Sequence, residues 1–383
     1  MLSFRLVKQA IYQDFSHSIR WVVYTGDRFL ALSIDTSNGN GKVLYSIDGT
    51  KDWRSSAFTT TTPPLISMAS TTETSVAISE NAIYTFPSSN LSQTSIEPME
   101  TGNDDLWTSV AYDSFGKFVA VSKPGTRLAR MLQSTNGSGP WTSVVLPDAI
   151  KTVGFLSIAA ASLVSNNNTY IAVLMDNSVK ISEYNGGTAW TLISTFGNVT
   201  TQPPTGISPG SIWSSVTYTG EEGGFVLLSS SDSAFAMSYD GTEWLYYKPE
   251  GDSYSWKSVS YDAAKKVYVV VASNNKIASI EVLFLPSGSF DRIIFNIIRN
   301  PSSTATGWSS IAFGNDIFVG VSGVPGGTIM TSKVSSATKP KPATGAAASR
   351  AGLGNTRGNL IPNHPKTGRR ARLTTGGSSL RKP

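Results

Sequence analysis

The chain has 383 residues, no cysteine and two histidines, with 31 Lys and Arg against 26 Asp and Glu residues. Its length allows one large domain or two to three ordinary ones. The missing cysteines exclude disulfides, thiolate metal sites and cysteine nucleophiles. His17 and His364 alone cannot form a three-histidine zinc centre, so we expect no metal and no other cofactor.

The charge divides the chain into two unlike parts. Residues 333–383 contain 11 Lys and Arg and no Asp or Glu, which leaves 20 basic and 26 acidic residues in residues 1–332. The body is therefore mildly acidic, and a basic tail follows it. Such asymmetry indicates that the tail, and not the body, meets an anionic partner.

A two-strand unit recurs through the body. Each copy begins with Trp, ends its first strand on Tyr or Phe, and continues after a turn into a strand that is apolar on both faces. The copies are Trp21–Tyr24 with Arg28–Ser33, Trp107–Tyr112 with Lys117–Ser122, Trp213–Tyr218 with Gly224–Ser229, Trp256–Tyr261 with Val267–Ala272, and Trp308–Phe313 with Ile317–Ser322. A strand without polar alternation is expected to be buried on both faces.

A third strand in several units leads into a turn of the form Ser-x-Asp/Asn-Gly, with a Trp shortly after it. Asn-Gly and Asp-Gly favour type I′ hairpin turns, because both central residues then need positive φ. The turns are Ser46, Asp48, Gly49 and Trp53; Ser134, Asn136, Gly137 and Trp141; and Ser238, Asp240, Gly241 and Trp244. A weaker version is Glu183-Tyr-Asn185-Gly186 before Trp190.

Two degenerate copies, beginning at Leu65 and near Thr152, fill the gaps in the spacing. Seven units of about 47 residues match the roughly 40–50 residues of four-stranded propeller blades. We therefore predict an all-β, seven-bladed β-propeller over residues 1–332, with blades starting near residues 19, 65, 106, 152, 212, 255 and 307. The strand Ser3–Val7 is expected to complete the last blade and close the ring. A β-sandwich or pair of sandwiches fits the strand content but not the period.

The recurring tryptophans are expected to pack in the blade cores rather than to form a ligand platform. They are Trp21, Trp107, Trp213, Trp256 and Trp308. An aromatic residue that returns once per blade is typical of packing between sheets.

The Ser-x-Asp/Asn-Gly…Trp turn resembles the Asp-box, or BNR repeat, of sialidase-like propellers, in which it is a structural turn between the third and fourth strands. The longer Trp-x-Ser-Val-x-Tyr unit is similar to repeats in propeller proteins of phages and large viruses. The sialidase resemblance implies an arginine triad and a tyrosine nucleophile with a glutamate. Here Phe4-Arg5-Leu6-Val7 holds the place of the first arginine motif but lacks its Ile-Pro.

Other enzyme signals are weak. Glycoside hydrolysis needs two facing carboxylates, but Asp104-Asp105, Glu221-Glu222 and Asp27 resemble exposed turn residues. The spacing of acidic residues also fits no metal site. We therefore expect a non-enzyme with no catalytic, cofactor-binding or metal-binding residues, and we keep a divergent sialidase-like glycosidase as an alternative.

Residues 333–383 are rich in Pro, Gly, Ala and Ser and lack aromatic residues, so the tail is expected to be disordered unless a partner orders it. Three roles fit it: an arm that contacts neighbouring subunits of a large assembly, a nucleic-acid contact through phosphates, or a solubilising segment. The candidate partner-binding residues are Arg350, Arg357, Lys366, Arg369, Arg370, Arg372, Arg381 and Lys382.

Together these features favour a non-enzymatic structural or adhesion component of a virus or phage particle, for receptor binding or decoration, anchored by its basic tail. The alternative is a cellular scaffold that binds a protein or glycan partner on one propeller face. We expect no membrane insertion, because no apolar run is long enough. The expected location is the virion, or otherwise the cytoplasm, since the N-terminus lacks a signal peptide.

Overall fold

In the computed structural model, every described residue lies in the unit Met1–Ser336. The described residues are 2–6, 17–55, 63–89, 91, 98–101, 105–113, 116–163, 167–184, 189–193, 197–198, 211–249, 253–284, 290–301, 307–324 and 326–333. The tail residues predicted to bind a partner lie outside these ranges.

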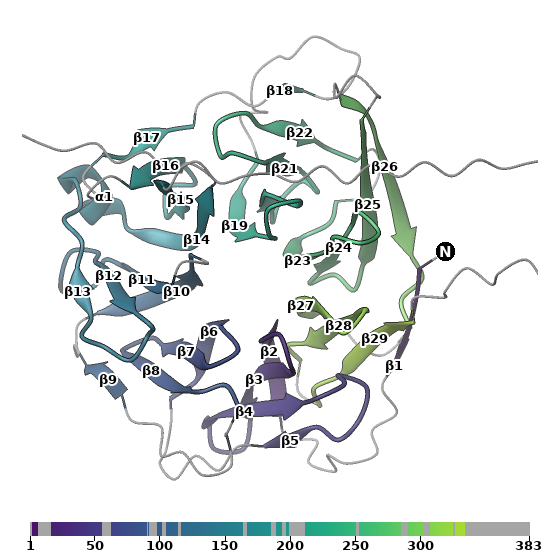
Figure 1. Cartoon of the computed structure of the whole chain (residues 1–383), viewed down its shortest axis with the longest axis horizontal. Coiled ribbons are helices and arrows are strands. Elements are labelled where there is room, and N and C mark those ends of the chain that lie inside the picture. Colours follow the sequence, from purple (N-terminus) through teal and green to yellow (C-terminus); the bar gives the residue numbers. More distant parts are fainter. Residues whose placement is uncertain are drawn as a thin grey trace, which may run out of the picture. The chain divides into compact units, whose positions relative to one another are not determined.

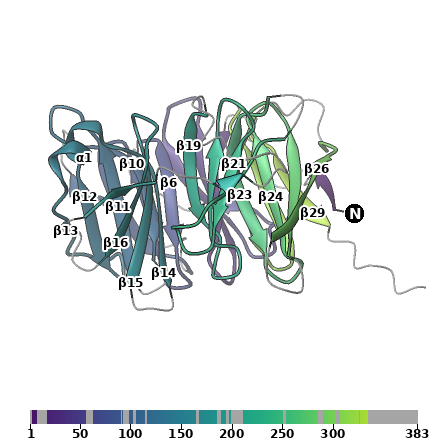
Figure 2. The same cartoon turned by 90° about the horizontal axis from the view of Figure 1, so that it is seen from above.

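Seven small sheets are arranged around a central axis, and each sheet has its first strand innermost (Figure 1). Seen from the side, the strands run between the two faces of the ring (Figure 2). The sheets are numbered as blades 1 to 7 in chain order. This confirms the predicted seven-bladed propeller.

The first four blades contain these strands. Blade 1 has β2 (His17–Tyr24), β3 (Phe29–Asp35), β4 (Gly41–Ser46) and β5 (Arg54–Ser55). Blade 2 has β6 (Leu65–Ser70), β7 (Thr74–Ser79), β8 (Ala82–Pro87) and β9 (Pro98–Thr101). Blade 3 has β10 (Leu106–Tyr112), β11 (Lys117–Lys123), β12 (Met131–Thr135) and β13 (Thr142–Ser143). Blade 4 has β14 (Phe155–Leu163), β15 (Asn167–Leu174), β16 (Val179–Tyr184) and β17 (Thr191–Leu192).

The last three blades continue the order. Blade 5 has β19 (Trp213–Tyr218), β20 (Phe225–Ser229), β21 (Phe235–Ser238) and β22 (Leu245–Tyr247), with β18 (Gly197–Asn198) added in parallel to β22. Blade 6 has β23 (Trp256–Asp262), β24 (Val267–Ala272), β25 (Ile277–Phe284) and β26 (Phe290–Ile298). Blade 7 has β27 (Trp308–Gly314), β28 (Ile317–Ser322) and β29 (Ile329–Lys333), followed outward by β1 (Ser3–Leu6).

The N-terminal strand closes the ring, as predicted. β1 pairs antiparallel with β29, with Phe4 opposite Ser332, and so supplies the outer strand of blade 7. Around the axis, each inner strand contacts the next, and β27 contacts β2. The ring therefore has no open end between its first and last blades.

The core consists of layers between blades rather than one central core. Among the described residues, seven hydrophobic clusters each lie between two consecutive blades. The second strands supply both sides of these layers, and β3 and β24 are buried along their whole length. This explains their continuous apolar sequence, because each face of the strand meets a different neighbouring blade.

Two short elements were not predicted. The helix α1 (Asp148–Val153) occupies the segment where the fourth unit was expected to start, and the inner strand of blade 4 begins after it, at Phe155. The parallel strand β18 comes from the long connection between blades 4 and 5.

Every inner strand carries a β-bulge at the same place. Near its start, each inner strand has one residue without a partner in the second strand, so the register shifts there. In blade 3, for example, the shift lies between Trp107 and Ser109. In six blades the residue after the bulge is a serine: Ser67, Ser109, Ser157, Ser215, Ser258 and Ser310. The bulge turns this side chain toward the neighbouring blade.

Five of these serines accept a hydrogen bond from a backbone N–H of the next blade. The pairs are Val110 N to Ser67 Oγ (3.3 Å), Ile158 N to Ser109 Oγ (3.3 Å), Val216 N to Ser157 Oγ (3.2 Å), Ile311 N to Ser258 Oγ (3.2 Å) and Val22 N to Ser310 Oγ (3.1 Å). These bonds join separate sheets close to the axis. They satisfy inner-strand donors that have no strand partner on that side.

We expect Ser109→Ala to lower the free energy of unfolding by about 1–3 kcal/mol, because the buried Ile158 N–H loses its acceptor. The matched control is Ser215→Ala, since the Ser215 hydroxyl makes no such bond within the described part of blades 5 and 6. Urea unfolding of both variants measures the difference. Equal losses at the two positions would contradict a role for the serine bonds.

Candidate functional site

The turns around Asp48 and Asp240 are built in the same way. The Ser46 and Ser238 hydroxyls accept the N–H of Gly49 (3.0 Å) and Gly241 (2.8 Å). Each Asp carboxylate accepts two backbone N–H groups that follow it, from Thr50 (2.9 Å) and Lys51 (3.0 Å), and from Thr242 (2.8 Å) and Glu243 (3.1 Å). The indole N–H groups of Trp53 and Trp244 close the turns on the glycine carbonyls.

The turn type differs from the sequence expectation. Type I′ geometry needs positive φ at both central residues, and only Asn136 (61°) and Gly137 (70°) meet this requirement. In the other two turns only the glycine of the two central residues has positive φ, at 67° for Gly49 and 84° for Gly241. The physical reason is that the Asp carboxylate organises a wider loop, in which the residues after the glycine donate to it.

The glycines of these turns pack on the preceding blade. A Cβ on Gly137 would lie 2.6 Å from Val76 Cγ2 in blade 2, and a Cβ on Gly49 would lie 2.7 Å from Val319 Cγ2 in blade 7. In addition, the Thr85 hydroxyl of blade 2 donates to the Gly137 carbonyl (2.6 Å). The turns therefore hold neighbouring blades together. The fourth, weaker turn lies mostly outside the described residues, although its Trp190 packs on Phe155 with ring centroids 5.7 Å apart.

Hydrogen bonds to the ionised carboxylates lower the pKa values of Asp48 and Asp240, although burial opposes the shift. A lowered pKa in the folded chain means that the contribution to stability is present above the ordinary carboxyl pKa and is lost as the pH falls through the folded value. We expect Asp48→Asn/Asp240→Asn to melt below the wild type at pH 7, with a gap that narrows at pH 3. Melting temperatures at both pH values test this, and a gap of constant size would contradict it.

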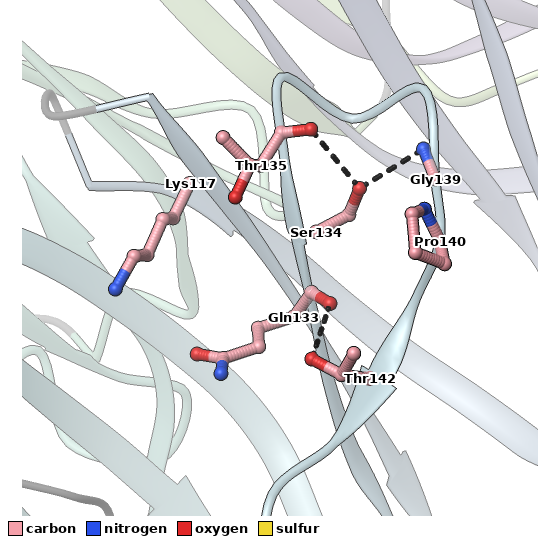
Figure 3. Close-up of a pocket in the computed structure, with 7 residues that line it drawn as sticks. All are labelled: Lys117, Gln133, Ser134, Thr135, Gly139, Pro140 and Thr142. Atoms are coloured by element: carbon pink, nitrogen blue, oxygen red, sulfur yellow. Dashed lines mark hydrogen bonds between the residues drawn. The ribbon is translucent and has the colours of Figure 1, made fainter.

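The turn at Asn136 borders a small pocket of about 170 Å³ on the outer part of blade 3. Its Ser134 hydroxyl accepts the N–H of Gly139 (3.1 Å) and lies 3.3 Å from the Thr135 carbonyl (Figure 3). The ends of the Lys117 and Gln133 side chains point away from the Gly139–Pro140 turn (Figure 3). This pocket does not bring together groups from different blades.

Four of the five recurring tryptophans lie in the layers between blades. Trp107, Trp213, Trp256 and Trp308 are at most 2% exposed. The Trp256 indole donates to the Ser233 carbonyl (2.7 Å), whereas the buried indole nitrogens of Trp107 and Trp308 have no partner among the described residues.

Trp21 packs against the hydrophobic cluster between blades 1 and 2, but it is less buried than the prediction of a core residue requires. The register of β2 with β3 places Ile19 opposite Ser33, where Trp107 lies opposite Ser122, and Trp21 takes the place after the bulge. Ile19 is therefore the core residue of blade 1. Trp21 is half-buried next to the axis, and its indole donates to the Met68 carbonyl of blade 2 (3.0 Å). It thus joins blades 1 and 2 where serines occupy the equivalent position in the other blades.

A cavity of about 350 Å³ lies on the axis, and residues from all seven inner strands line it. Its middle is lined by small and hydroxyl-bearing residues, including Ser157 and Ser215, and by Trp21. Lys257 lines it near the start of β23, whereas Tyr261 lines it near the end of the same strand. Described residues of every blade therefore converge on this cavity.

One end of this cavity is surrounded by aromatic rings, which we call the aromatic mouth. Its members are Tyr24, Tyr112, Tyr218, Tyr261 and Phe313, the last residues of the Trp-x-Ser-Val-x-Tyr/Phe units. Each ring packs against an aromatic residue at the first or second position of the second strand of its own blade, with ring centroids 4.4–5.0 Å apart. All five are half-buried, so each has one side in the blade and one at the surface.

The turns that follow the inner strands place carboxylates around the aromatic mouth. These turns are described in full in blades 1, 2, 5, 6 and 7, and in part in blade 3. Among the described residues of these turns and of the strand ends that flank them, the acidic residues are Asp27, Glu73, Asp113, Glu221, Glu222, Asp262 and Asp316, and the basic residues are Arg28, Lys117, Lys265 and Lys266. Two of the basic residues already pair with acids of their own turn, Arg28 with Asp27 (2.7 Å) and Lys265 with Asp262 (2.6 Å). The mouth is therefore net negative.

These carboxylates act on the tyrosines beside them. Burial first, and then a neighbouring carboxylate, raise the pKa of three tyrosines: Asp27 acts on Tyr24, Asp113 on Tyr112 and Glu221 on Tyr218. Burial, Tyr239, Glu222 and Asp262 together raise the pKa of Tyr261 to about 12. The phenols are consequently neutral at physiological pH, and the charge at the mouth comes from the carboxylates.

The remaining sequence candidates are dispersed. Arg5 is on β1, the outermost strand of blade 7. Asp105 is buried and pairs with Arg130 (2.5 Å). Within the described ranges, no group of three or more His, Asp or Glu residues is placed to hold a metal ion. The same residues include no helix of the length and apolarity needed to cross a membrane.

The sequence matches no protein-family model and no curated protein. Solved structures resemble it in shape. They include a catalytically inactive virginiamycin B lyase from Staphylococcus aureus with quinupristin (TM-score 0.62, 9% identity, 87% of this chain and 100% of that one). A second is YCF48 bound to a D1 peptide (TM-score 0.57, 9% identity, 86% of this chain and 94% of that one). A third is the WD40 propeller domain of Doa1 (TM-score 0.55, 15% identity, 87% of this chain and 98% of that one). At such low identity the likeness shows the β-propeller fold alone.

Proposed function

We propose that this chain is a non-enzymatic propeller that binds a protein partner at the aromatic mouth. The observation that carries the proposal is the set of five half-buried rings that five blades place around one axial cavity. Tyrosine is enriched in protein interfaces because its ring buries apolar area while its hydroxyl stays hydrated. A propeller of similar shape, YCF48, is bound to a D1 peptide, which supports binding of a polypeptide.

The lining of the cavity supports binding rather than catalysis. Among its described residues, the ionisable side chains are Lys257 and the four tyrosines of the mouth. Hydrolysis of a glycosidic bond requires two carboxylates, one on either side of that bond. The described residues that line the cavity include no Asp or Glu. Arg5, the candidate for a sialidase triad, is on the outer edge of blade 7.

We further propose that the propeller serves as a structural or adhesion component of a virus or phage particle, with the basic tail as a second point of attachment. The tail carries 11 Lys and Arg and no acidic residue, which supports electrostatic contact with a separate partner. The runner-up is a cellular scaffold with the same binding end. If the protein is a cellular scaffold, we expect to find it free in solution and not associated with particles.

Photo-crosslinking and sedimentation test these proposals together. A benzophenone amino acid replaces Phe313 at the mouth or, as the control, the exposed Val145 on the outside of blade 3. We expect a discrete protein adduct from position 313 only, in native source material. Adducts from both positions, or from 145 alone, would contradict binding at the mouth.

The particle proposal has its own readout. Full-length protein in a megadalton fraction, with its tail protected from trypsin, is the expected result. A soluble pool that loses about 50 residues at once, as a free basic tail would, would leave the scaffold in its place. Turnover of a fluorogenic sialoside that disappears in Arg5→Ala would overturn the non-enzymatic proposal.

A further inference from the structure

Four carboxylates at the aromatic mouth have no basic partner within the described chain. They are Glu73 of blade 2, Glu221 and Glu222 of blade 5, and Asp316 of blade 7. All four are exposed. They therefore remain hydrated, and they can pair with an incoming cation at little cost in desolvation.

The rings beside them line the same end of the cavity. Aromatic faces attract ammonium and guanidinium groups through their quadrupole, most strongly when carboxylates nearby add to the negative potential. At the opposite end, Lys257 lines the cavity. The axial cavity is thus negative at the aromatic mouth and positive near Lys257 at its other end. A cationic group is therefore expected to bind at the mouth.

A second aromatic pair extends this surface between blades 5 and 6. Tyr239 and Phe284 are 44% and 41% exposed, with ring centroids 6.0 Å apart. Tyr239 is also electrostatically coupled to the mouth residue Tyr261. Tyr239 lies beside the turn with Glu221 and Glu222, because a Cβ on Gly224 at the end of that turn would lie 2.9 Å from Tyr239 Cα.

We propose that the aromatic mouth and the Tyr239–Phe284 pair bind a lysine- or arginine-rich segment of a partner polypeptide. This names the partner chemistry for the proposed function and rests on it. Charge complementarity selects a cationic segment, and the rings give its alkyl stems and charged ends apolar area and cation–π contacts. The raised pKa values of Tyr24, Tyr112 and Tyr218 support the negative potential, since a nearby carboxylate contributes to each shift.

Fluorescence anisotropy with the full chain and a labelled octa-arginine peptide tests the inference. We expect Glu221→Gln/Glu222→Gln to raise the dissociation constant of the peptide about tenfold, since two exposed charge pairs are lost. Tyr239→Ala is expected to raise the dissociation constant severalfold through the loss of a ring contact. All three residues are exposed, so we expect both variants to keep the fold, and circular dichroism checks this.

The matched control is Asp148→Asn/Asp176→Asn, which removes two exposed carboxylates from the opposite face of the ring. Equal weakening by both double variants would show a general effect of net charge and would overturn the site. No binding of octa-arginine, or equal binding of octa-glutamate or a neutral glycan, would overturn the partner chemistry. If the adduct at position 313 still forms in those cases, the proposed function stands and only this inference fails.

Discussion

Trp256→Ala is expected to lower the free energy of unfolding by about 3–5 kcal/mol, the range for removing a large side chain from a packed core. Trp256 is 0% exposed and packs with Tyr254 and Phe295, at ring-centroid distances of 5.1 and 6.1 Å. Its removal also leaves the Ser233 carbonyl without the indole donor. Urea unfolding at 25 °C, followed by tryptophan fluorescence and circular dichroism, measures the loss.

The other tryptophans provide controls for this result. Trp21→Ala should cost clearly less, because Trp21 is half-buried and borders the axial cavity. Trp107→Phe should cost less than Trp256→Phe by about 1 kcal/mol, since only the Trp256 indole makes a hydrogen bond that the substitution removes. A Trp21→Ala loss as large as that of Trp256→Ala would contradict the assignment of Ile19, and not Trp21, to the core position of blade 1.

The sequence predicts the propeller because its period, its apolar second strands and its Gly turns are local signals. The first unit shows where such signals mislead. If Trp21 is aligned with the Trp that begins the other units, the first unit is two residues too short. If Tyr24 is aligned with Tyr112 instead, because both pair with a Phe of the second strand, then Ile19 falls at the core position. An aromatic residue at the position after the bulge is what disguised the register.

The contacts between blades could not be predicted from the sequence. Ser109 and Ile158, or Ser310 and Val22, meet only because the ring closes, and nothing near either residue in the chain indicates its partner. The aromatic mouth is an intermediate case. The final Tyr or Phe of each unit is visible in the sequence, but the convergence of five rings on one cavity depends on the sevenfold arrangement.

The glycine of the Asn136 turn should be nearly as sensitive as the core tryptophan. Gly137 has φ of 70°, and a Cβ there would lie 2.6 Å from Val76 Cγ2 and 2.9 Å from Phe118 Cδ2. For Gly137→Ala we expect about 1–2 kcal/mol from the left-handed backbone, and about 1–3 kcal/mol more from overpacking between blades 2 and 3. The loss of unfolding free energy in urea measures the sum.

Gly39→Ala separates the two contributions. Gly39 has a similar φ of 76°, but a Cβ there would meet nothing within 4 Å, so this variant reports the backbone cost alone. The excess loss in Gly137→Ala is then the cost of pushing blade 3 away from blade 2. Val76→Ala in the Gly137→Ala background should recover part of that excess, because it removes the methyl group that the new Cβ meets. Equal losses at residues 39 and 137 would show that the turn needs glycine only for its backbone conformation, and not for contact between the blades.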